Sequence, residues 1–208
     1  MANSNAPYGA RVHHGGGAYA FNARGTVYSI PTSDSTNAYY VGDAVKQAAS
    51  GDANGIPNIT KAAGTDTLRG FIVGIYPPGL FPGGSIQGTP LALENVYVPA
   101  TKAAAYYVLV DDDPSTIFTM RDDGITTSKL VAASCNLNFS ITVTAGSTNQ
   151  SASGSVILSS SFATTATLNM KAMGLAQIPG NAFGAYAQWL CRVNVHELML
   201  GAIGSVGV

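Results

Sequence analysis

Acidic residues gather in two short segments, and their carboxylates are the groups of this chain best suited to hold a metal ion. Asp111–Asp113 comes directly before Pro114, and Asp122–Asp123 comes directly before Gly124. Hard cations such as Ca²⁺ bind convergent carboxylate oxygens, which two acidic turns flanking one strand could supply. The same residues are also ordinary turn formers, and their spacing does not match an EF-hand loop. Both interpretations stay open here, and no residue is assigned as a metal ligand.

The three histidines are spread along the chain. His13 and His14 lie in a glycine-rich N-terminal segment, and His196 follows an alternating apolar stretch near the C-terminus. A metal triad needs ligands at compatible spacing with supporting partners, and a catalytic histidine needs a nucleophile beside it. Neither pattern is present. We therefore expect His196 to be a half-buried side chain that is hydrogen-bonded to a neighbouring strand.

Sequence motifs for nucleotide binding or hydrolysis are missing as well. The chain contains no G-x-S-x-G and no Walker motif, and Gly15–Gly17 does not stand between a strand and a helix. The sequence thus predicts a non-enzyme without catalytic residues or cofactors.

Charge is scarce, and this restricts the partners. Only 10% of the residues are charged and the net charge is −1, while glycine occurs 24 times. Phosphate binding needs clustered Lys and Arg, so nucleic acid is not expected as a partner. A surface of small neutral polar groups favours permanent packing against other protein subunits.

No apolar run has the roughly 18 residues of a membrane helix, and the start lacks a secretory pattern, so we expect synthesis in a cytoplasm without membrane insertion. Cys135 and Cys191 are then expected as buried thiols rather than a disulfide.

Short apolar stretches separated by turn residues predict strands through most of the chain. The expected strands are 26–30, 38–47, 67–76, 91–98, 104–110, 115–121, 136–144, 155–159, 167–175 and 188–198. The clearest alternation places Trp189, Cys191, Val193 and Val195 on one face. A helical turn or two is expected only near Ser128–Ala133.

The spacing of these strands is typical of a sandwich or barrel. We predict three parts: an extended arm at 1–25, a small β unit at 26–100 and a β body at 101–208. The arm carries Tyr8, Tyr19 and Phe21, aromatic side chains that an uncharged extended segment cannot bury alone. It is expected either to order against a partner or to pack on its own domain.

Several segments together resemble the capsid decoration, or cement, proteins of tailed double-stranded DNA bacteriophages. The similar segments are MANSNAPYGAR at the start, YVGDAVK from Tyr40, GIPNITKAA from Gly55, LRGFIVG from Leu68, YVLVDDDP from Tyr107, Ile117-Phe118, and WLCRVNVHEL from Trp189. Cys191 and Glu197 depart from the family pattern.

This resemblance implies an all-β, jelly-roll-like β-sandwich with a smaller N-terminal β unit and an extended N-terminal arm. It further implies a structural protein on the outer surface of the virion, made in the host cytoplasm, which bridges subunits of the major capsid protein. Self-association into a homodimer or homotrimer is expected too. Tyr8, Arg11, Tyr19 and Phe21 are the candidate capsid contacts.

A second hypothesis is a carbohydrate-binding or receptor-binding β-sandwich of a phage particle. Tyr106 and Tyr107 beside Asp111–Asp113 could form a lectin-like site, although tyrosines are also favoured in strands for packing alone.

Overall fold

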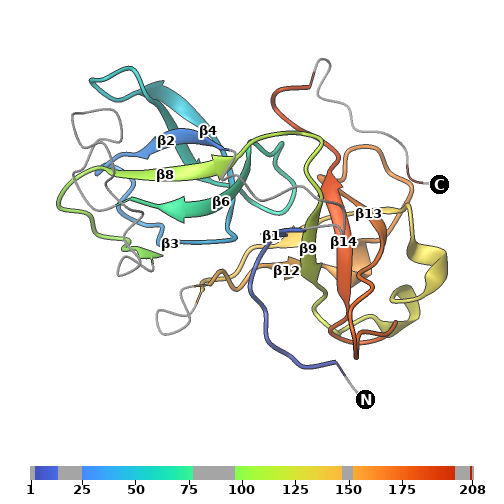
Figure 1. The fold of residues 1–208 in the computed structure, drawn as a ribbon. Helices are drawn as coiled ribbons and strands as arrows, with labels where there is room; N and C mark the ends of the chain where they lie inside the picture. Colours follow the sequence, from blue (N-terminus) through green and yellow to red (C-terminus); the bar gives the residue numbers. More distant parts are fainter. Residues whose placement is uncertain (1–2, 14–24, 77–96, 147–151, 200–206, 208) are drawn as a thin grey trace.

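The computed structural model describes residues 3–13, 25–76, 97–146, 152–199 and 207. Strands dominate these residues, and the only helices among them are single 3-10 turns, so the all-β prediction is confirmed. Figure 1 shows two regions side by side, a barrel and a sheet-based body. Among the described residues, no helix has the length and apolar character needed to span a bilayer.

The barrel is a closed ring of five strands in the order β2-β5-β4-β6-β8. Their bounds are β2 Thr26–Ile30, β4 Ala44–Gly51, β5 Pro57–Lys61, β6 Gly70–Ile75 and β8 Tyr106–Asp111. Only the contact of β2 with β5 is parallel; the other pairs are antiparallel. Closure leaves no unpaired edge, and the ring encloses a core of Tyr, Ile and Val side chains.

Strand β8 corrects the predicted domain boundary. Residues 101–208 were expected to form one body, but β8 pairs along its length with β2 and also with β6. The small β unit predicted at 26–100 is therefore completed by residues up to Asp111. The predicted strand 38–47 is also divided, into β3 (Tyr39–Tyr40) and β4, because a turn at Gly42 separates them. Strand β3 pairs with β7 (Tyr97–Val98) in a short ribbon.

The body is built on a second five-stranded sheet, in the order β1-β9-β14-β13-β10. Their bounds are β1 Arg11–Val12, β9 Phe118–Arg121, β14 Gln188–Val193, β13 Met170–Leu175 and β10 Asn138–Phe139. All pairs in this sheet are antiparallel. Trp189, Cys191 and Val193 are buried on one face, as the alternation predicts.

The predicted strand 136–144 is divided between two sheets. Strand β10 belongs to the five-stranded sheet, whereas β11 (Ile141–Thr142) pairs with β12 (Val156–Ile157). Ser140 separates them, and its backbone hydrogen-bonds to Leu158 and to the Ser161 hydroxyl instead. Helical turns at Thr127–Lys129 and Ala132–Ser134 confirm the one helical prediction, while a third turn, Ser159–Ser161, overlaps the end of a predicted strand.

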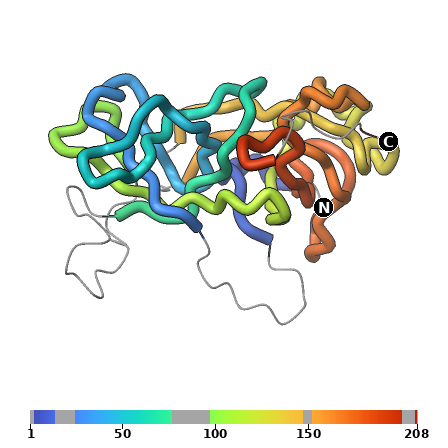
Figure 2. Tube along the Cα trace, turned by 90° about the horizontal axis from the view of Figure 1, so that it is seen from above, coloured from blue at the N-terminus to red at the C-terminus, as the bar shows by residue number. Residues whose placement is uncertain are grey.

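The two regions share a hydrophobic core. The cluster around Trp189 and Phe118 includes Ala44, Leu68 and Phe71, which come from the barrel or the segment leading into it. The rings of Phe71 and Phe118 lie 4.7 Å apart between centroids. Seen from above in Figure 2, the regions are in contact rather than joined by a free linker.

Both cysteines are free thiols, and the prediction that they are buried is confirmed for Cys191 but wrong for Cys135. Cys191 is fully buried, which raises the pKa of its thiol, whereas Cys135 is only half-buried.

Candidate interaction surface

The N-terminal segment 3–13 lies along the body of its own chain. Arg11 and Val12 form the edge strand β1 and pair with Thr119 and Phe118 of β9. Farther toward the N-terminus, the Asn3 amide donates hydrogen bonds to the carbonyls of Ala182 and Ala185. This part of the predicted arm thus packs on its own domain, the second of the two expectations. The candidate contacts Tyr19 and Phe21 lie outside the described residues.

Tyr8 and Arg11, the other two candidate contacts, meet on the outer side of the sheet. The Tyr8 hydroxyl donates to Gln188 Oε1 at 2.7 Å. The guanidinium carbons of Arg11 and Arg121 lie 4.6 and 5.6 Å from the Tyr8 ring centroid, which places two cations against one aromatic ring. Burial raises the pKa of Tyr8, so its hydroxyl stays protonated and donates. The sequence suggested Tyr8 and Arg11 but gave no sign of Arg121.

A close backbone approach holds the segment in place. Ala10 donates from its backbone N–H to the Gly42 carbonyl at 3.0 Å. A Cβ on Gly9 would stand 2.4 Å from that carbonyl oxygen, and one on Gly42 would stand 2.7 Å from the Tyr8 carbonyl oxygen. Both glycines also have positive φ, so glycine is required at both positions.

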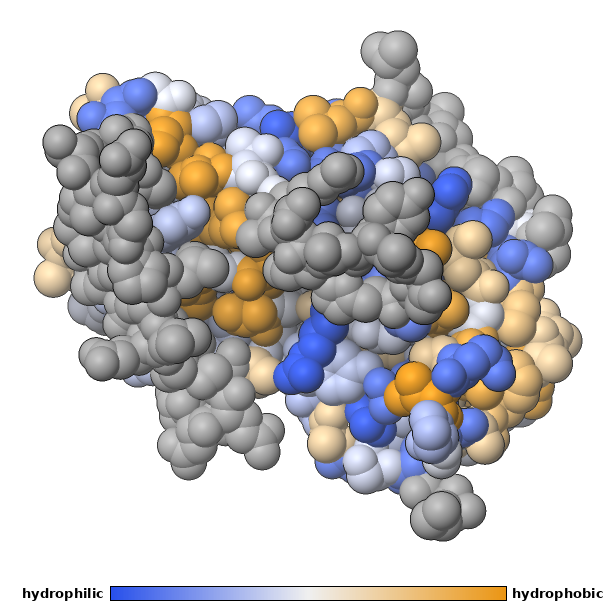
Figure 3. Space-filling view, viewed as in Figure 1, coloured by the Kyte–Doolittle hydropathy of each residue, from blue (hydrophilic) through white to orange (hydrophobic). Residues whose placement is uncertain are grey.

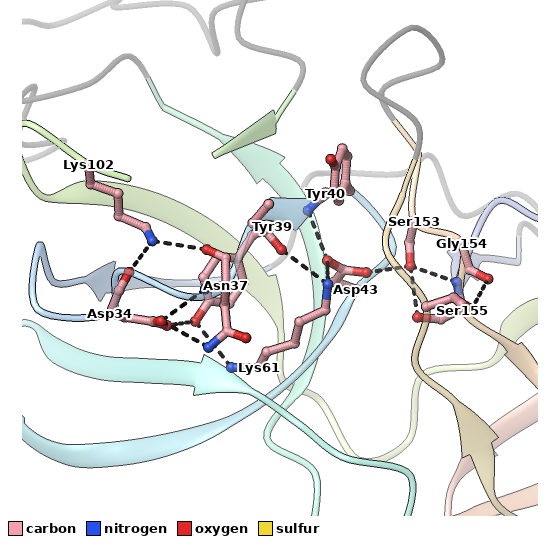
Figure 4. Close-up of polar contacts among 12 residues, drawn as sticks. Asp34, Asn37, Tyr39, Tyr40, Asp43, Lys61, Lys102, Ser153, Gly154 and Ser155 are labelled. Atoms are coloured by element: carbon pink, nitrogen blue, oxygen red, sulfur yellow. Dashed lines mark hydrogen bonds and ion pairs between the residues drawn. The ribbon is translucent and has the colours of Figure 1, made fainter. Parts of the chain in front are cut away.

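The turn at Gly42 also carries a buried carboxylate that joins the barrel to the body (Figure 4). Asp43 is fully buried and forms an ion pair with Lys61 at 2.9 Å. It accepts hydrogen bonds from the Tyr40 backbone N–H at 3.0 Å and from the Ser153 hydroxyl, and that hydroxyl also contacts Ser155. Because every group in this cluster has a partner inside the protein, we interpret it as a structural junction. Sequence reasoning missed it, although an aspartate inside an apolar run was a usable signal.

A second buried polar group lies in the barrel next to this junction (Figure 4). The Lys102 ammonium donates to the carbonyls of Asp34, Asn37 and Ala100. The Asp34 carboxylate accepts from Asn37 and from the hydroxyl of Tyr39. Burial lowers the pKa of Lys102, and three carbonyl acceptors compensate for its lost hydration. This arrangement closes the loop before β3 and leaves no group free for chemistry.

The acidic turns do not converge on a common point. They lie at opposite ends of β9, which separates Asp111–Asp113 from Asp122–Asp123. Asp111 and Asp113 accept hydrogen bonds from Thr116 and Ser115, as turn residues do. The other turn is also satisfied within the protein. Asp122 accepts hydrogen bonds from Trp189 Nε1 and from the backbone N–H groups of Gly124 and Tyr186, and Asp123 accepts from the Ser159 hydroxyl and the Ile125 backbone N–H. Within the described ranges, no group of three or more His, Cys, Asp and Glu side chains could hold a metal ion.

His196 joins the body to the barrel. Its residue forms an isolated parallel bridge with Leu68, and its Nδ1 accepts from the Leu198 backbone N–H at 3.0 Å. The side chain is 1% exposed, more buried than the sequence predicted, and Nε2 has no hydrogen-bond partner in the described structure. Burial, with Arg69 nearby, lowers the pKa of His196.

The tyrosines of the carbohydrate hypothesis lie away from the acidic turn. Tyr106 and Tyr107 begin β8 while Asp111 ends it, which separates them by about 13–17 Å at roughly 3.3 Å per residue. Tyr107 is buried, and its hydroxyl donates to Asp52 at 2.6 Å. Strand packing therefore accounts for Tyr107.

Large apolar side chains are exposed on the body. The described residues contain eight of them, and all eight lie between positions 117 and 199. They are Ile117, Ile125, Val131, Met173, Ile178, Phe183, Leu198 and Met199. Ile125 is the most exposed, at 78%. Figure 3 shows apolar and hydrophilic residues interspersed over the body on the side that faces the viewer. Single exposed apolar side chains are normal on a soluble protein, so what distinguishes these eight is that all of them belong to the body.

Comparisons with known proteins add no relative to this picture. No protein-family model matches the chain. No curated protein and no solved structure matches it either.

Proposed function

We propose that this protein is a structural component of a phage particle that binds the outer surface of the assembled capsid and bridges major capsid subunits. The observation that carries the proposal is that the exposed large apolar side chains among the described residues all belong to the body. Interfaces between proteins combine such side chains with arginine and are poor in Asp and Glu. The segments that resemble cement proteins, given above, supply the choice of capsid as partner.

The ribbon β11-β12 contributes Ile141 and Ile157 to the core that the five-stranded sheet covers. We include in the proposal that the body follows a jelly-roll-like sandwich plan, with this ribbon as part of the second layer. A protein that binds the assembled lattice but not free subunits stabilises the lattice by mass action, and many copies on one shell multiply modest contacts.

The test is binding to undecorated, expanded phage heads. Purified protein is mixed with heads, co-sedimentation is measured, and the temperature at which the heads rupture is recorded. Saturable binding with a raised rupture temperature supports the proposal and gives the copy number per shell. Absence of binding contradicts it, and a specific hit on a glycan array would then favour the carbohydrate-binding alternative.

The arm is tested separately with Tyr19→Ser/Phe21→Ser. Deleting residues 2–25 is a poor experiment, because Ala10 is buried in the body core and its loss would destabilise the fold. The double substitution leaves segment 3–13 intact. Reduced binding to heads, with an unchanged melting temperature, is expected if these aromatic side chains contact the capsid. Binding equal to wild type would remove them from the contact set. Sedimentation equilibrium of the free protein separately tests whether it is a homodimer or homotrimer.

A further inference from the structure

The outer face of the five-stranded sheet carries an unusual set of charges. Opposite the buried row of Trp189, Cys191 and Val193, the sheet presents Arg11 on β1, Arg121 on β9, Lys171 on β13 and Arg192 on β14. We call these four residues the cationic face. They are four of only ten Lys and Arg residues in the chain.

Strand register brings these side chains to one side. Arg11 pairs with Thr119, which pairs with Leu190 in the next strand. Arg121 is opposite Gln188, whose side-chain oxygen accepts a hydrogen bond from the Tyr8 hydroxyl. Side chains two apart on a strand share a face, so Arg192 lies on the same side as Gln188 and Leu190. Lys171 is the direct partner of Arg192.

Among the described residues, Arg11, Arg121 and Arg192 form no ion pair with a carboxylate. The five strands of the sheet contain no Asp or Glu. Elsewhere in the described chain, Lys46, Lys61 and Arg69 each have a carboxylate within 4.0 Å. Arg11 and Arg121 instead contact the Tyr8 ring, and Arg121 also donates to the carbonyls of Ser4 and Tyr186. The side chain of Arg192 makes no hydrogen bond or ion pair with another described residue, and its Nε has no acceptor there.

We propose that the cationic face is a docking surface for a carboxylate-rich patch on a protein partner. The inference rests on the proposed function, and it assigns the acidic patch to the surface of the assembled capsid. Arginine suits this pairing because its planar guanidinium binds a carboxylate through two parallel hydrogen bonds. Stacking against Tyr8 limits the freedom of Arg11 and Arg121, so less side-chain entropy is lost on binding.

Protein carboxylates fit the face better than nucleic acid does. The cations are interspersed with Thr119, Gln188 and Leu190 on a sheet, and the chain as a whole has a net charge of −1. Phosphate backbones are bound by dense clusters of Lys and Arg with a favourable overall charge. A mixed face with few cations is typical of a protein interface, in which charges set orientation and specificity.

The experiment compares charge reversals on and off this face. Arg11→Glu, Arg192→Glu and the double variant are measured for binding to undecorated heads at low and high salt. Lys129→Glu is the matched control, because Lys129 is exposed on a helical turn outside the sheet. Circular dichroism and the melting temperature establish that each variant is folded. The double variant Arg11→Gln/Arg192→Gln removes both positive charges without adding negative ones. It therefore separates the loss of attraction to the partner's carboxylates from the repulsion that glutamate adds.

We expect each reversal to weaken binding roughly fivefold, with the double variant weaker than either and the glutamine pair intermediate. The salt dependence of binding is expected to fall in the same order, and Lys129→Glu to bind as wild type. If wild type binds heads but the reversals bind equally well, the docking surface is wrong and the proposed function stands.

If the wild-type protein does not bind heads, the proposed function fails. The cationic face is then tested separately by measuring binding to poly-L-glutamate. Binding to poly-L-glutamate that the double reversal abolishes supports a carboxylate-docking face, and no binding overturns it. Tighter binding to a short DNA duplex than to poly-L-glutamate of equal charge also overturns it, in favour of nucleic acid.

Discussion

The barrel and the body differ in whether their positively charged side chains are paired with carboxylates. In the barrel, Lys61 is paired with the buried Asp43 at 2.9 Å and Lys46 with Asp66 at 2.8 Å. In the five-stranded sheet of the body, the strands carry four cations and no carboxylate. The barrel therefore neutralises its charge internally, while the body presents charge outward.

The most exposed large apolar side chains follow the same division. The described part of the barrel contains no large hydrophobic side chain among the exposed ones, whereas the body contains all eight. A closed ring of strands has no unpaired edge to which another strand could add. The overall composition of the chain therefore does not reveal that the two regions differ: the barrel pairs its charges internally, whereas the body is better suited to contact with partners.

The largest expected effect comes from substitutions in the two hydrophobic cores. They test whether the barrel and the body unfold together or independently. Phe71 and Ile72 are neighbours on β6, both fully buried, but Phe71 belongs to the core of the body and Ile72 to the core of the barrel. Phe71→Ala is expected to cost about 3–5 kcal/mol and Ile72→Ala about 2–5 kcal/mol of unfolding free energy. The single tryptophan, Trp189, lies in the body and reports its unfolding by fluorescence.

Because the two regions share a core, both variants are expected to lower the denaturation midpoint seen by Trp189. A midpoint that Ile72→Ala leaves unchanged would mean that barrel and body unfold independently. Circular dichroism, which sees both regions, would then show two transitions.

The next effect concerns the buried junction. Asp43→Asn is expected to lower the unfolding free energy by about 3–5 kcal/mol, because Lys61 loses its counter-charge in a buried site. Asp66→Asn is the matched control, since Asp66 also pairs with a lysine but its side chain is 25% exposed. Its expected cost is below about 1 kcal/mol. Urea denaturation of both variants measures the difference, and equal costs would contradict a structural role for the junction.

The smallest effect is a pH dependence at the second contact between the regions. Burial lowers the pKa of His196 below its ordinary value of 6.5, so the unfolded chain binds a proton at this site more readily than the folded chain. Stability therefore falls as the pH drops below about 6.5, by at most about 1.3 kcal/mol between pH 7 and pH 5.5. Arg69, Asp112, Asp113 and Glu197 are the charged groups near this histidine.

His196→Asn keeps an acceptor for the Leu198 N–H but cannot titrate. Thermal unfolding of both proteins between pH 7 and pH 5.5 measures the difference. The variant is expected to lose less stability than wild type over this range. Parallel curves would show that His196 does not titrate there.

Local patterns predicted much of the fold. The alternation around Trp189 and Cys191 gave the correct buried face of β14, and Phe139 with Ile141 gave the correct inward side chains of β10 and β11. Strand β8 was placed in the wrong region because its nearly continuous apolar run fits any buried strand. Its pairing with β2, some eighty positions earlier in the sequence, is what places β8 in the barrel.

The candidate site was harder to predict for the same reason. Tyr8 and Arg11 were identified, but Arg121 joins them only through the pairing of strands far apart in sequence. The junction at Asp43 depends on Ser153, 110 positions away. Whether the two acidic turns converge was left open by the sequence, and they are separated because β9 lies between them.

The edge strand β1 sets the order in which this protein is completed during synthesis. Arg11 contacts Thr119 across 108 positions, and the sheet that it extends also needs β14, which ends at Val193. All strands of the barrel, by contrast, have left the ribosome once Asp111 has emerged. Segment 3–13, although made before the barrel, therefore reaches its final place in the complete sheet only after β14 has been translated.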